Sequence, residues 1–328
     1  MTHLTVRRLL IDLEPPVARH WCGGDAFLTA WFNALSMSFP VGEQFFLDSV
    51  RRGWKALPAD QQAQREAEVK GFVGQEATHR RIHSLFNAHL ERHGLVNDWE
   101  PRALARLAPL EQADPRHALA ITAANEHFTA LFADWLLARP EVLAGAEPRL
   151  QTLWLWHSAE ESEHKCTAFD LYQALGGSHA WRVTWMRRVT LIFLTDTLRQ
   201  TAANLRRDGT LWRWSTWRSA YVHLLGRDGL LRQSFNAAMD AVPDSVDHAE
   251  VSAFLAAQPG VTALHHLHIW PLGAGEIALT AHLVRPDDLD HDAFIDATTH
   301  ALDHRFGINH ATLQIESAGY AQGCAGDG

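Results

Sequence analysis

The chain has 328 residues, of which 47% are hydrophobic and 20% charged. This length and composition exclude a disordered chain and leave room for two folded domains. The formal net charge of −9 argues against a nucleic-acid-binding protein, whose binding face would carry a basic patch.

The cysteines and the apolar segments bear on the location of the protein. Cys22, Cys166 and Cys324 form no C-x-x-C pair and no even framework, which favours a reducing cytoplasm. The first residues lack the long apolar stretch of a secretory signal, and no apolar run approaches the length of a membrane-spanning helix. We therefore expect a cytoplasmic protein without a transmembrane span.

The first half of the chain has the pattern of long helices. In chain order we expect an irregular arm over residues 1–24, helices over about 25–54, 60–93, 115–139 and 149–175, a connector over 94–113 and a turn over 140–148. Asp25 and Asp114 are the expected N-caps. Pro40 and Gly42 interrupt the first helix just before Glu43, either as a plain kink or as a bend that aims Glu43 inward.

The fourth of these helices carries the most informative motif. In LWLWHSAEESEHKCTAFDLY, residues 153–172, Glu161 and His164 form a Glu-x-x-His pair. This spacing lets a carboxylate and an imidazole reach one metal ion from one helix. Glu76 and His79 repeat the pair in FVGQEATHRRIHSLF.

A lone glutamate in an apolar setting precedes each pair. Glu43 lies 33 residues before Glu76, and Glu126 lies 35 residues before Glu161. Each of these glutamates alone could be a solvated surface charge, but the repeated spacing favours metal ligands. One Glu from each of two helices and Glu-x-x-His from two others is the arrangement of ferritin-like dinuclear carboxylate proteins. The expected ligands are Glu43, Glu76, His79, Glu126, Glu161 and His164, and the expected fold is a mainly α, ferritin-like four-helix metal-binding bundle with extra helices.

Three further polar residues lie on or beside the same helix faces. His83 and His157 sit one turn from expected ligands, and Glu160 precedes Glu161. They can act as hydrogen-bonding partners of the ligands, as extra ligands or as a proton relay. The alternative is that each histidine is an ordinary residue at the edge of the core.

Residues 180–242 continue as helix and are rich in tryptophan and arginine, among them Trp181, Trp185, Trp212, Trp214 and Trp217. Such helices can lie on a membrane surface, which would give the protein a peripheral membrane contact. The alternative, which we favour, is that they pack over the bundle with extended arginine side chains.

After residue 243 the pattern changes to a small α/β domain of order αββαβ. We expect helices over about 247–258 and 290–306, strands in ALHHLHIWPL, EIALTAHLV and HATLQIE, and a disordered tail over 318–328. Strict alternation predicts an apolar face of Leu267, Ile269, Ile277, Leu279, Ala281, Leu313 and Ile315. The opposite face then carries His266, His268, Thr280, His282, His310, Thr312, Gln314 and Glu316. This polar face is either plain solvent-facing surface or a metal or dimer surface.

Residues of about 5–240 resemble the bacterial proteins named predicted metal-dependent hydrolases. The resemblance rests on FPVGEQFFLDSVR, FVGQEATHRRIH, ANEHF and WHSAEESEHK. It implies a metal-binding helical domain, predicted here over residues 1–242, while the name itself establishes no activity.

Residues of about 233–317 resemble the cytoplasmic C-terminal domain of cation diffusion facilitator transporters. SFNAAMDAVPDSVD, GVTALHHLHIW, GEIALTAHLV and FGINHATLQIE carry this resemblance. It implies a metallochaperone-like domain, predicted here over residues 243–317, that forms a dimer and can bind zinc between subunits. It also implies that His265, His282 and His310 lie near ligand positions, with His291 as a further candidate. Alternation instead puts His265 on the core side and His268 outside, so these two remain alternatives.

These features predict a dinuclear metal enzyme. Four glutamates form a hard, anionic ligand set that suits iron, with manganese as the alternative. We expect an oxidase or oxygenase that acts on an apolar small molecule. Its substrate site would be lined by Phe39, Phe45, Phe72, Phe128, Phe132 and Trp154, although core packing also accounts for these side chains. The alternatives are a metal-dependent hydrolase and a non-enzymatic protein that stores or senses metal. The C-terminal domain would make the protein a homodimer and bind zinc.

Overall fold

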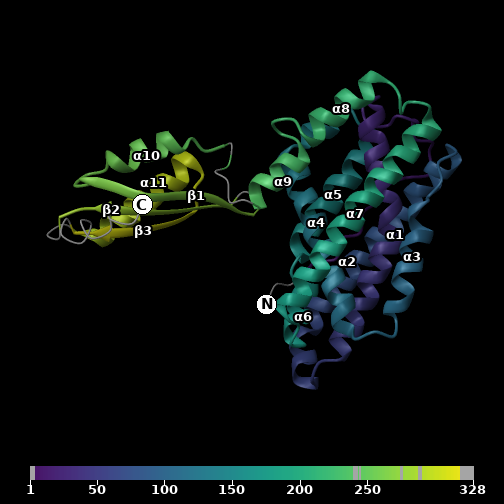
Figure 1. Cartoon of the computed structure of the whole chain (residues 1–328), viewed down its shortest axis with the longest axis horizontal. Helices are drawn as coiled ribbons and strands as arrows, with labels where there is room; N and C mark the ends of the chain where they lie inside the picture. The colour runs from purple at the N-terminus through teal and green to yellow at the C-terminus, as the bar shows by residue number, and fades with distance from the viewer. Residues whose placement is uncertain (1–3, 239–242, 244, 274–275, 287–289, 318–328) are drawn as a thin grey trace. The chain divides into compact units, whose positions relative to one another are not determined.

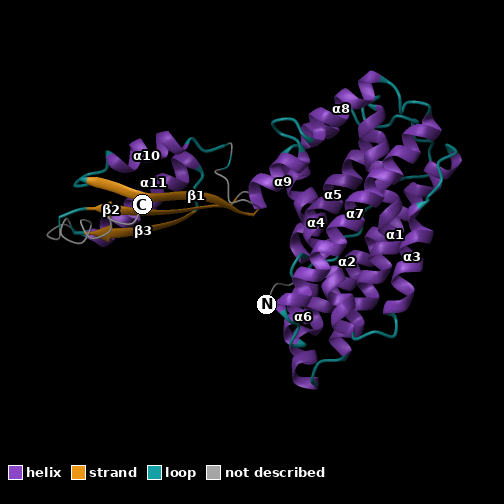
Figure 2. Cartoon of the chain, in the orientation of Figure 1, coloured by secondary structure: helices purple, strands orange, loops and turns teal. Residues whose placement is uncertain are grey.

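The structure is a computed structural model that describes residues 4–238, 243, 245–273, 276–286 and 290–317. The chain divides into two compact units, residues 1–226 and 227–328. The first unit is helical, and the second combines helices with a sheet, as the colours of Figure 2 show. The predicted disordered tail, residues 318–328, lies outside the described residues.

The helical unit consists of long helices joined by short turns (Figure 1). Its α-helices are α1 (Ala26–Lys55), α2 (Ala59–Arg92), α3 (Trp99–Leu107), α4 (Pro115–Ala138), α5 (Pro148–His164), α6 (Thr167–Ala174), α7 (His179–Asp208) and α8 (Trp214–Leu224), with 3-10 turns at Ala108–Leu110 and Pro140–Leu143.

The structure confirms both predicted N-cap residues, Asp25 and Asp114. The Asp25 side chain accepts a hydrogen bond from the Leu28 backbone N–H, and the Asp114 side chain accepts one from Arg116. Pro115 occupies the first position of α4, where its missing N–H has no cost. The α1 helix continues through Pro40, and Glu43 on its next turn is buried.

Helices α1, α2, α4 and α5 surround a common interior. Helix α1 packs against both α2 and α4, α4 packs against α5, and α5 contacts α2. The interior contains fully buried large side chains, among them Phe32, Phe72 and Trp154. Helix α7 covers α1 and α4 from outside. The arrangement places the inward faces of four helices around one buried volume.

Two predictions for the helical unit are wrong, one for a connector and one for a helix. The connector over 94–113 contains α3, because Trp99 and Ala103 pack against Val41 in the tertiary structure. The predicted helix over 149–175 is split at Lys165 and Cys166 into α5 and α6, and no side chain caps the start of α6.

The segment predicted as continuing helix over 180–242 is divided into α7, α8 and α9 (Leu230–Ala238). Gly209 ends α7 in the left-handed conformation, which glycine adopts without steric cost. Helix α7 packs on the bundle, as the favoured alternative predicts. Trp212 and Trp214 nevertheless remain 87% and 81% exposed, so packing does not account for them. Within the described part of the chain, no helix has the length and apolar character needed to cross a membrane.

The second unit has the predicted αββαβ order. It contains α10 (His248–Ala256), β1 (Ala263–Gly273), β2 (Glu276–Val284), α11 (His291–Phe306) and β3 (His310–Glu316), preceded by α9. The strands form one sheet of order β1-β2-β3, in which β1 is antiparallel and β3 parallel to β2. Helix α10 contacts β1, and α11 contacts β3.

The predicted apolar face of this sheet is confirmed. Ile269, Leu279, Ala281 and Leu313 are buried in one cluster with residues of both helices, and Leu267, Ile277 and Ile315 pack against it. Glu316, predicted on the opposite face, is only 3% exposed, and it accepts hydrogen bonds from two histidines of that face.

Strict alternation fails in β1 between His265 and His268. The pairing register shifts there, and His266 has a φ of 51°. This bulge changes which side each residue faces, so His265 pairs directly with His282 of β2. The prediction that His265 lies on the core side is therefore wrong, because a bulge inserts an extra residue that alternation does not count.

Candidate metal centres

The structure brings all the predicted ligands of the helical unit into its buried interior. Glu43 comes from α1, Glu76 and His79 from α2, Glu126 from α4, and Glu161 and His164 from α5. None of these residues is more than 5% exposed. Each Glu-x-x-His pair spans one turn, so helix geometry alone points both of its side chains the same way.

The ligand atoms form two neighbouring groups. Glu76, Glu126, Glu161 and His164 each offer one atom, and these atoms lie within 4.8 Å of one another. Glu43, His79 and His157 form the second group by the same measure. His157, considered from the sequence as a partner or an extra ligand, thus joins the ligand atoms directly. Its Nε2 lies 2.8 Å from Glu161 Oε1 and 3.9 Å from Glu43 Oε1.

Each Glu-x-x-His histidine is held by one ring nitrogen and presents the other to the carboxylates. His79 Nε2 lies 3.0 Å from Glu160 Oε2, which leaves His79 Nδ1 facing Glu161 Oε1 at 3.4 Å. His164 Nδ1 lies 2.9 Å from Gln75 Oε1, which leaves His164 Nε2 facing Glu76 Oε1 at 2.9 Å. Such partners fix the tautomer and orientation of histidines that bind metals.

The N-terminal arm supports both of these partners. The Arg7 backbone N–H donates to Glu160 Oε1 at 3.1 Å, and Gln75 Nε2 donates to the Thr5 carbonyl at 3.1 Å. The Arg7 guanidinium also binds Glu163, which accepts from Gln75. The segment predicted as an irregular arm therefore helps to position both histidines.

A hydrogen-bonded chain leads away from the ligand atoms. His157 Nδ1 lies 2.7 Å from His83 Nε2, and His83 Nδ1 lies 2.9 Å from Ser36 Oγ. The Ser36 hydroxyl in turn donates to Asn87 Oδ1 at 2.7 Å. His157, His83 and Ser36 can each exchange a proton, so the chain can move a proton between Glu161 and Ser36.

Three of the four carboxylates accept no hydrogen bond. Both side-chain oxygens of Glu43, Glu76 and Glu126 are buried without a hydrogen bond, as are His79 Nδ1 and His164 Nε2. A buried carboxylate that lacks partners is costly, and most such groups in proteins are paired or bind metal ions. These orphaned atoms all belong to the two ligand groups.

Burial and mutual repulsion raise the pKa of three glutamates. The pKa of Glu43 is raised well above its usual value by burial and then by the charges of Glu76 and Glu161. Burial is also the main cause of the raised pKa of Glu76 and of Glu126, the latter to about 8. Nearby cations would remove this penalty.

The pKa values of Glu161, His79 and His157 are shifted by burial and by the groups around them. Burial alone would raise the pKa of Glu161, but its close contacts with His157, His164 and His79 outweigh burial and lower that pKa well below its usual value. Burial opposes protonation of His79, yet its hydrogen bond to Glu160 and its contact with Glu161 raise its pKa to about 9. Burial lowers the pKa of His157 to about 4. Divalent ions among these carboxylates would replace their protons and offset their mutual repulsion.

The predicted apolar residues lie around this site in different ways. The Phe39 ring centroid lies 4.6 Å from those of His83 and His157, and Phe72 lies 4.9 Å from His164. Trp154 packs 5.2 Å from His83. Phe128 and Phe132 instead contact other aromatic rings, stacking on Phe193 and packing against Trp154 respectively. Phe45 lies beside an apolar cavity described below.

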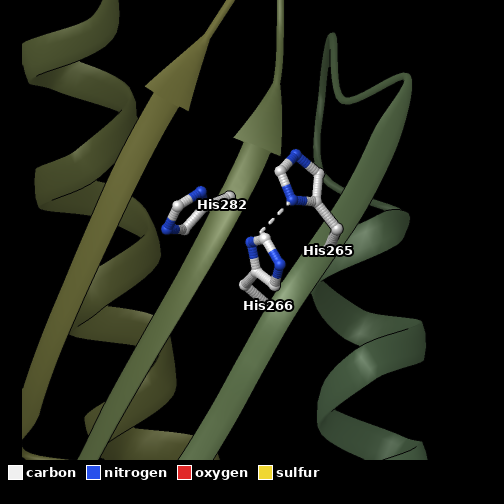
Figure 3. Close-up of side chains that lie close together, drawn as sticks. All are labelled: His265, His266 and His282. Atoms are coloured by element: carbon white, nitrogen blue, oxygen red, sulfur yellow. Dashed lines mark hydrogen bonds between the residues drawn. The ribbon is translucent and has the colours of Figure 1, made fainter. Parts of the chain in front are cut away.

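The second unit brings three histidines of the sheet together. His265 and His266 on β1 and His282 on β2 each offer a ring nitrogen, and these atoms lie within 4.8 Å of one another (Figure 3). The Nδ1 atoms of His265 and His266 are 3.2 Å apart. Glu316 accepts from His265 Nε2 and His282 Nδ1 at 3.0 and 2.7 Å.

The structure separates the remaining predicted ligands of this unit from that group. His268 is opposite Thr280, and His310 is opposite Ala278, whereas the partner of His282 on β3 is Gln314. His310 therefore lies four positions along its strand from the residue beside His282. His291 begins α11 and contacts Arg285.

Sequence reasoning missed several residues that shape the two sites. Gln75 and Arg7 orient ligands through contacts across 89 and 153 residues of chain, which no local pattern reveals. His266 was predicted on the polar face but not as a ligand, although it adjoins His265. Glu316 carries no signal beyond its place at the end of the last strand.

Two family models match the chain. The model described as "Predicted metal-dependent hydrolase" matches residues 5–248. The model described as "Cation efflux protein, cytoplasmic domain" matches residues 243–318.

The C-terminal part is also similar to parts of curated transporters. The metal cation efflux system protein CzcD of Cupriavidus metallidurans is 39% identical over 90 residues, which are 27% of this chain and 28% of that protein. The zinc transporter ZitB of Escherichia coli is 35% identical over 88 residues, 26% of this chain and 28% of that protein. A solved structure, the metal-bound C-terminal domain of the CzcD transporter, is 38% identical and covers 22% of this chain and 99% of that domain, with a TM-score of 0.21.

The chain thus spans little more than a quarter of the length of these transporters. The first family model, in contrast, covers most of the chain and includes every predicted ligand of the helical unit. The chain belongs to the family of predicted metal-dependent hydrolases, and a cation efflux cytoplasmic domain is fused to its C-terminal side.

Proposed function

We propose that the helical unit is a ferritin-like, dinuclear metal enzyme that uses iron to oxidise an apolar small molecule. The observation that carries this proposal is the buried set of four glutamates and two Glu-x-x-His histidines on four helices. Their oxygen atoms accept few hydrogen bonds, and Glu160 and Gln75 hold the histidines by their outer nitrogens.

The proposed ligands are Glu43, Glu76, His79, Glu126, Glu161 and His164, with His157 as a seventh donor. Four carboxylates nearly neutralise two divalent ions and favour hard metals such as iron or manganese. Two iron ions in such a site supply the ability to reduce dioxygen. The chain contributes a dry, apolar surround through Phe39 and Trp154 and a proton path through His157 and His83.

The second candidate is hydrolysis, which the family description favours. A metal-dependent hydrolase needs a water molecule made acidic by the metal and a base to accept its proton. His157 is buried and lies within hydrogen-bonding distance of both Glu161 and His83, so it is placed to pass a proton between them. Metal storage or sensing is a third candidate, and an apolar cavity beside the site favours an enzyme over it.

We propose that the second unit forms a homodimer and binds zinc through His265, His266 and His282, with Glu316 orienting two of these rings. The description of its family as a cytoplasmic domain supports this assignment and a cytoplasmic location.

The deciding experiment uses protein purified without oxygen and loaded with ferrous iron. Metal analysis should find two ions per helical unit, and stopped-flow mixing with oxygen should produce an absorbance change that depends on oxygen concentration. Glu161→Ala should abolish this change, whereas Glu91→Ala, an exposed position on α2, should not. If oxygen causes no change and zinc- or manganese-loaded protein cleaves esters or amides in a Glu161-dependent manner, the hydrolase is the correct function.

A further inference from the structure

An apolar cavity of about 180 Å³ lies among α1, α3, α4 and α7 of the helical unit. Aromatic rings form much of its wall, including Phe39, Phe46, Trp99, Trp185 and Phe193. An engineered apolar cavity of about 150 Å³ binds benzene, so this space holds a group of about six carbon atoms. The cavity is thus large enough for part of a small organic molecule.

The cavity adjoins the proposed metal centre. Phe39 lines it, and the same ring packs 4.6 Å from the rings of His83 and His157. Gly42 and Asn125 also line it, and each immediately precedes a proposed ligand, Glu43 or Glu126. One wall of the cavity is therefore formed by the turns of α1 and α4 that carry these glutamates.

A wider cleft adjoins the cavity. This cleft of about 800 Å³ is lined by residues of α1, α2 and α3. It shares Val41, Phe45, Leu107 and Leu110 with the cavity, so the two spaces meet along these side chains. The cavity therefore lies next to a larger cleft on the side of these four residues.

Arg106 is the charged residue among the described side chains that line the cavity. Its Nη2 binds Oδ2 of Asp196, a residue that is 1% exposed. The other oxygen of this carboxylate, Oδ1, lies 3.1 Å from Arg102 Nε and 4.0 Å from Arg199 Nη1. Three guanidinium groups therefore share one carboxylate, which leaves an excess of positive charge. Arg102 has a buried nitrogen, Nη2, without a hydrogen-bond partner.

We propose that the substrate is an apolar carboxylate whose chain or ring fills the cavity and whose carboxylate binds Arg106. This inference deepens the proposed function and rests on it for the identity of the reacting centre. A guanidinium binds a carboxylate with two parallel hydrogen bonds and so orients it. An apolar tail of about six to eight carbons matches the volume of the cavity.

Calorimetric titration of the full-length, metal-loaded protein without oxygen tests this inference, with octanoate as the probe. Octanoate should bind, and affinity should rise about fourfold for each methylene added from butanoate to octanoate, the effect of burying one CH₂ group. Octanamide, of equal length but neutral, should bind at least tenfold more weakly. Arg106→Gln should weaken octanoate binding at least tenfold and leave octanamide binding unchanged.

Arg81→Gln is the matched control, because Arg81 lines the outer cleft but not the cavity and loses the same charge. It should bind octanoate as the parent does. Ala103→Leu, which adds three carbons to the cavity wall, should weaken octanoate and octanamide alike while circular dichroism shows an unchanged fold. The inference is overturned if octanoate does not bind, if octanamide binds equally well, or if Arg106→Gln has no effect.

These results are separable from the test of the metal centre. Loss of octanoate binding with two metals and an oxygen reaction retained refutes only the substrate class. Octanoate binding in a protein that takes up no metal refutes the proposed function and leaves the binding site standing.

Discussion

Glu161 is the residue at which the two candidate ligand groups of the helical unit meet. Its Oε1 lies 2.8 Å from His157 and 3.4 Å from His79, and its Oε2 lies 3.7 Å from His164. Three histidines around one carboxylate explain why its pKa is lowered while those of Glu43, Glu76 and Glu126 are raised. If metal ions bind here, Glu161 is placed to contribute to both groups.

Replacing Glu76 and Glu161 together by Ala should remove most of the bound metal and destabilise the helical unit. Loss of these ligands leaves buried carboxylates without compensation, at a cost of about 3–5 kcal/mol for a broken buried pair. Metal content by mass spectrometry and the midpoint of urea unfolding measure both effects. Full metal occupancy in the double variant would disprove the ligand assignment, and Glu91→Ala is the control for the loss of an acidic residue.

Glu160→Gln tests whether Glu160 orients His79 without touching the metal. The substitution keeps the size of the side chain but removes the charge that bonds to His79 Nε2. Loss of such a supporting partner lowers metal affinity by about 10–100-fold. Competition with a chelator measures the affinity, and Glu91→Gln should leave it unchanged. Equal affinities for Glu160→Gln and the parent would mean that Glu160 is structural only.

At the scale of elements, the N-terminal arm is joined to the helical unit at both of its ends. Arg7 binds Glu160 near the ligands, and Arg19 and His20 bind Asp208 at the end of α7. An irregular segment is held in place here by polar contacts with helices that follow much later in the chain. The arm therefore contributes to the stability of the site.

Asp208→Asn should reduce the stability of the helical unit by about 1–2 kcal/mol near neutral pH, because it removes hydrogen bonds to a charged acceptor. Burial of Asp208 opposes its ionisation, but hydrogen bonds from His20, Thr210 and Arg19 outweigh burial and lower its pKa. A lowered pKa in the folded state stabilises the fold above the unfolded value, about 3.9. That contribution is lost as pH falls towards the folded value.

Urea unfolding of Asp208→Asn and the parent between pH 3 and 7 checks this prediction. The difference between them should be constant from pH 5 to 7 and should shrink below about pH 4. Asp60→Asn, at an exposed position of α2, is the control. A difference that grows in acid would contradict the assigned role of Asp208.

The region around α8 should bind membranes that contain anionic lipid. Trp212, Trp214 and Trp217 are 87%, 81% and 51% exposed, and Arg213 and Arg218 beside them are exposed too. Aromatic side chains enter the interfacial region of a bilayer, and arginine is attracted to anionic headgroups. Flotation with phosphatidylglycerol vesicles measures the bound fraction.

The Trp212→Ser, Trp214→Ser double variant should lower the bound fraction by at least half. Leu10→Ser, which removes an 80% exposed apolar side chain of the arm, should not change it. If the parent protein stays with the unbound fraction, these tryptophans have another partner.

At the scale of the whole molecule, the chain joins two units with separate cores and separate candidate metal groups. The two groups of the helical unit are buried among helices. On the sheet, His265 and His282 are half-buried and His266 is exposed. A buried site suits chemistry that excludes water, and an accessible site suits metal exchange. The candidate groups of the two units therefore differ in their exposure to solvent.

The isolated unit of residues 227–328 should be a dimer that binds zinc. His265→Ala and His282→Ala should each weaken zinc binding at least tenfold, because each removes one of three ligands. His310→Ala, on the same sheet but outside the group, should not. Binding should also weaken in acid, since only neutral imidazole coordinates metal. Ultracentrifugation with and without zinc measures the dimer, and a monomer under both conditions would refute this role.

Much of the helical unit could be predicted because its signals are local. The helix caps at Asp25 and Asp114 and both Glu-x-x-His pairs depend on residues within one or two turns. The same holds for the apolar face of the sheet, which follows from a period of two residues. Apolar neighbours on the same helix also indicated that Glu76 and Glu161 face inward. Their role as ligands remains a prediction.

Other features exist only in the tertiary structure. Helix α3 forms in a segment predicted as a connector, because Trp99 packs against Val41 of α1. The contact between Gln75 and His164 spans 89 residues of chain. The bulge at His266 depends on how β1 pairs with β2, so it could not be read from β1 alone. The cavity beside Phe39 is a gap left by four packed helices. Sequence determined which residues face the interior, because periodicity is a property of one element. Packing decided which of them meet, because distances between elements depend on every side chain between them.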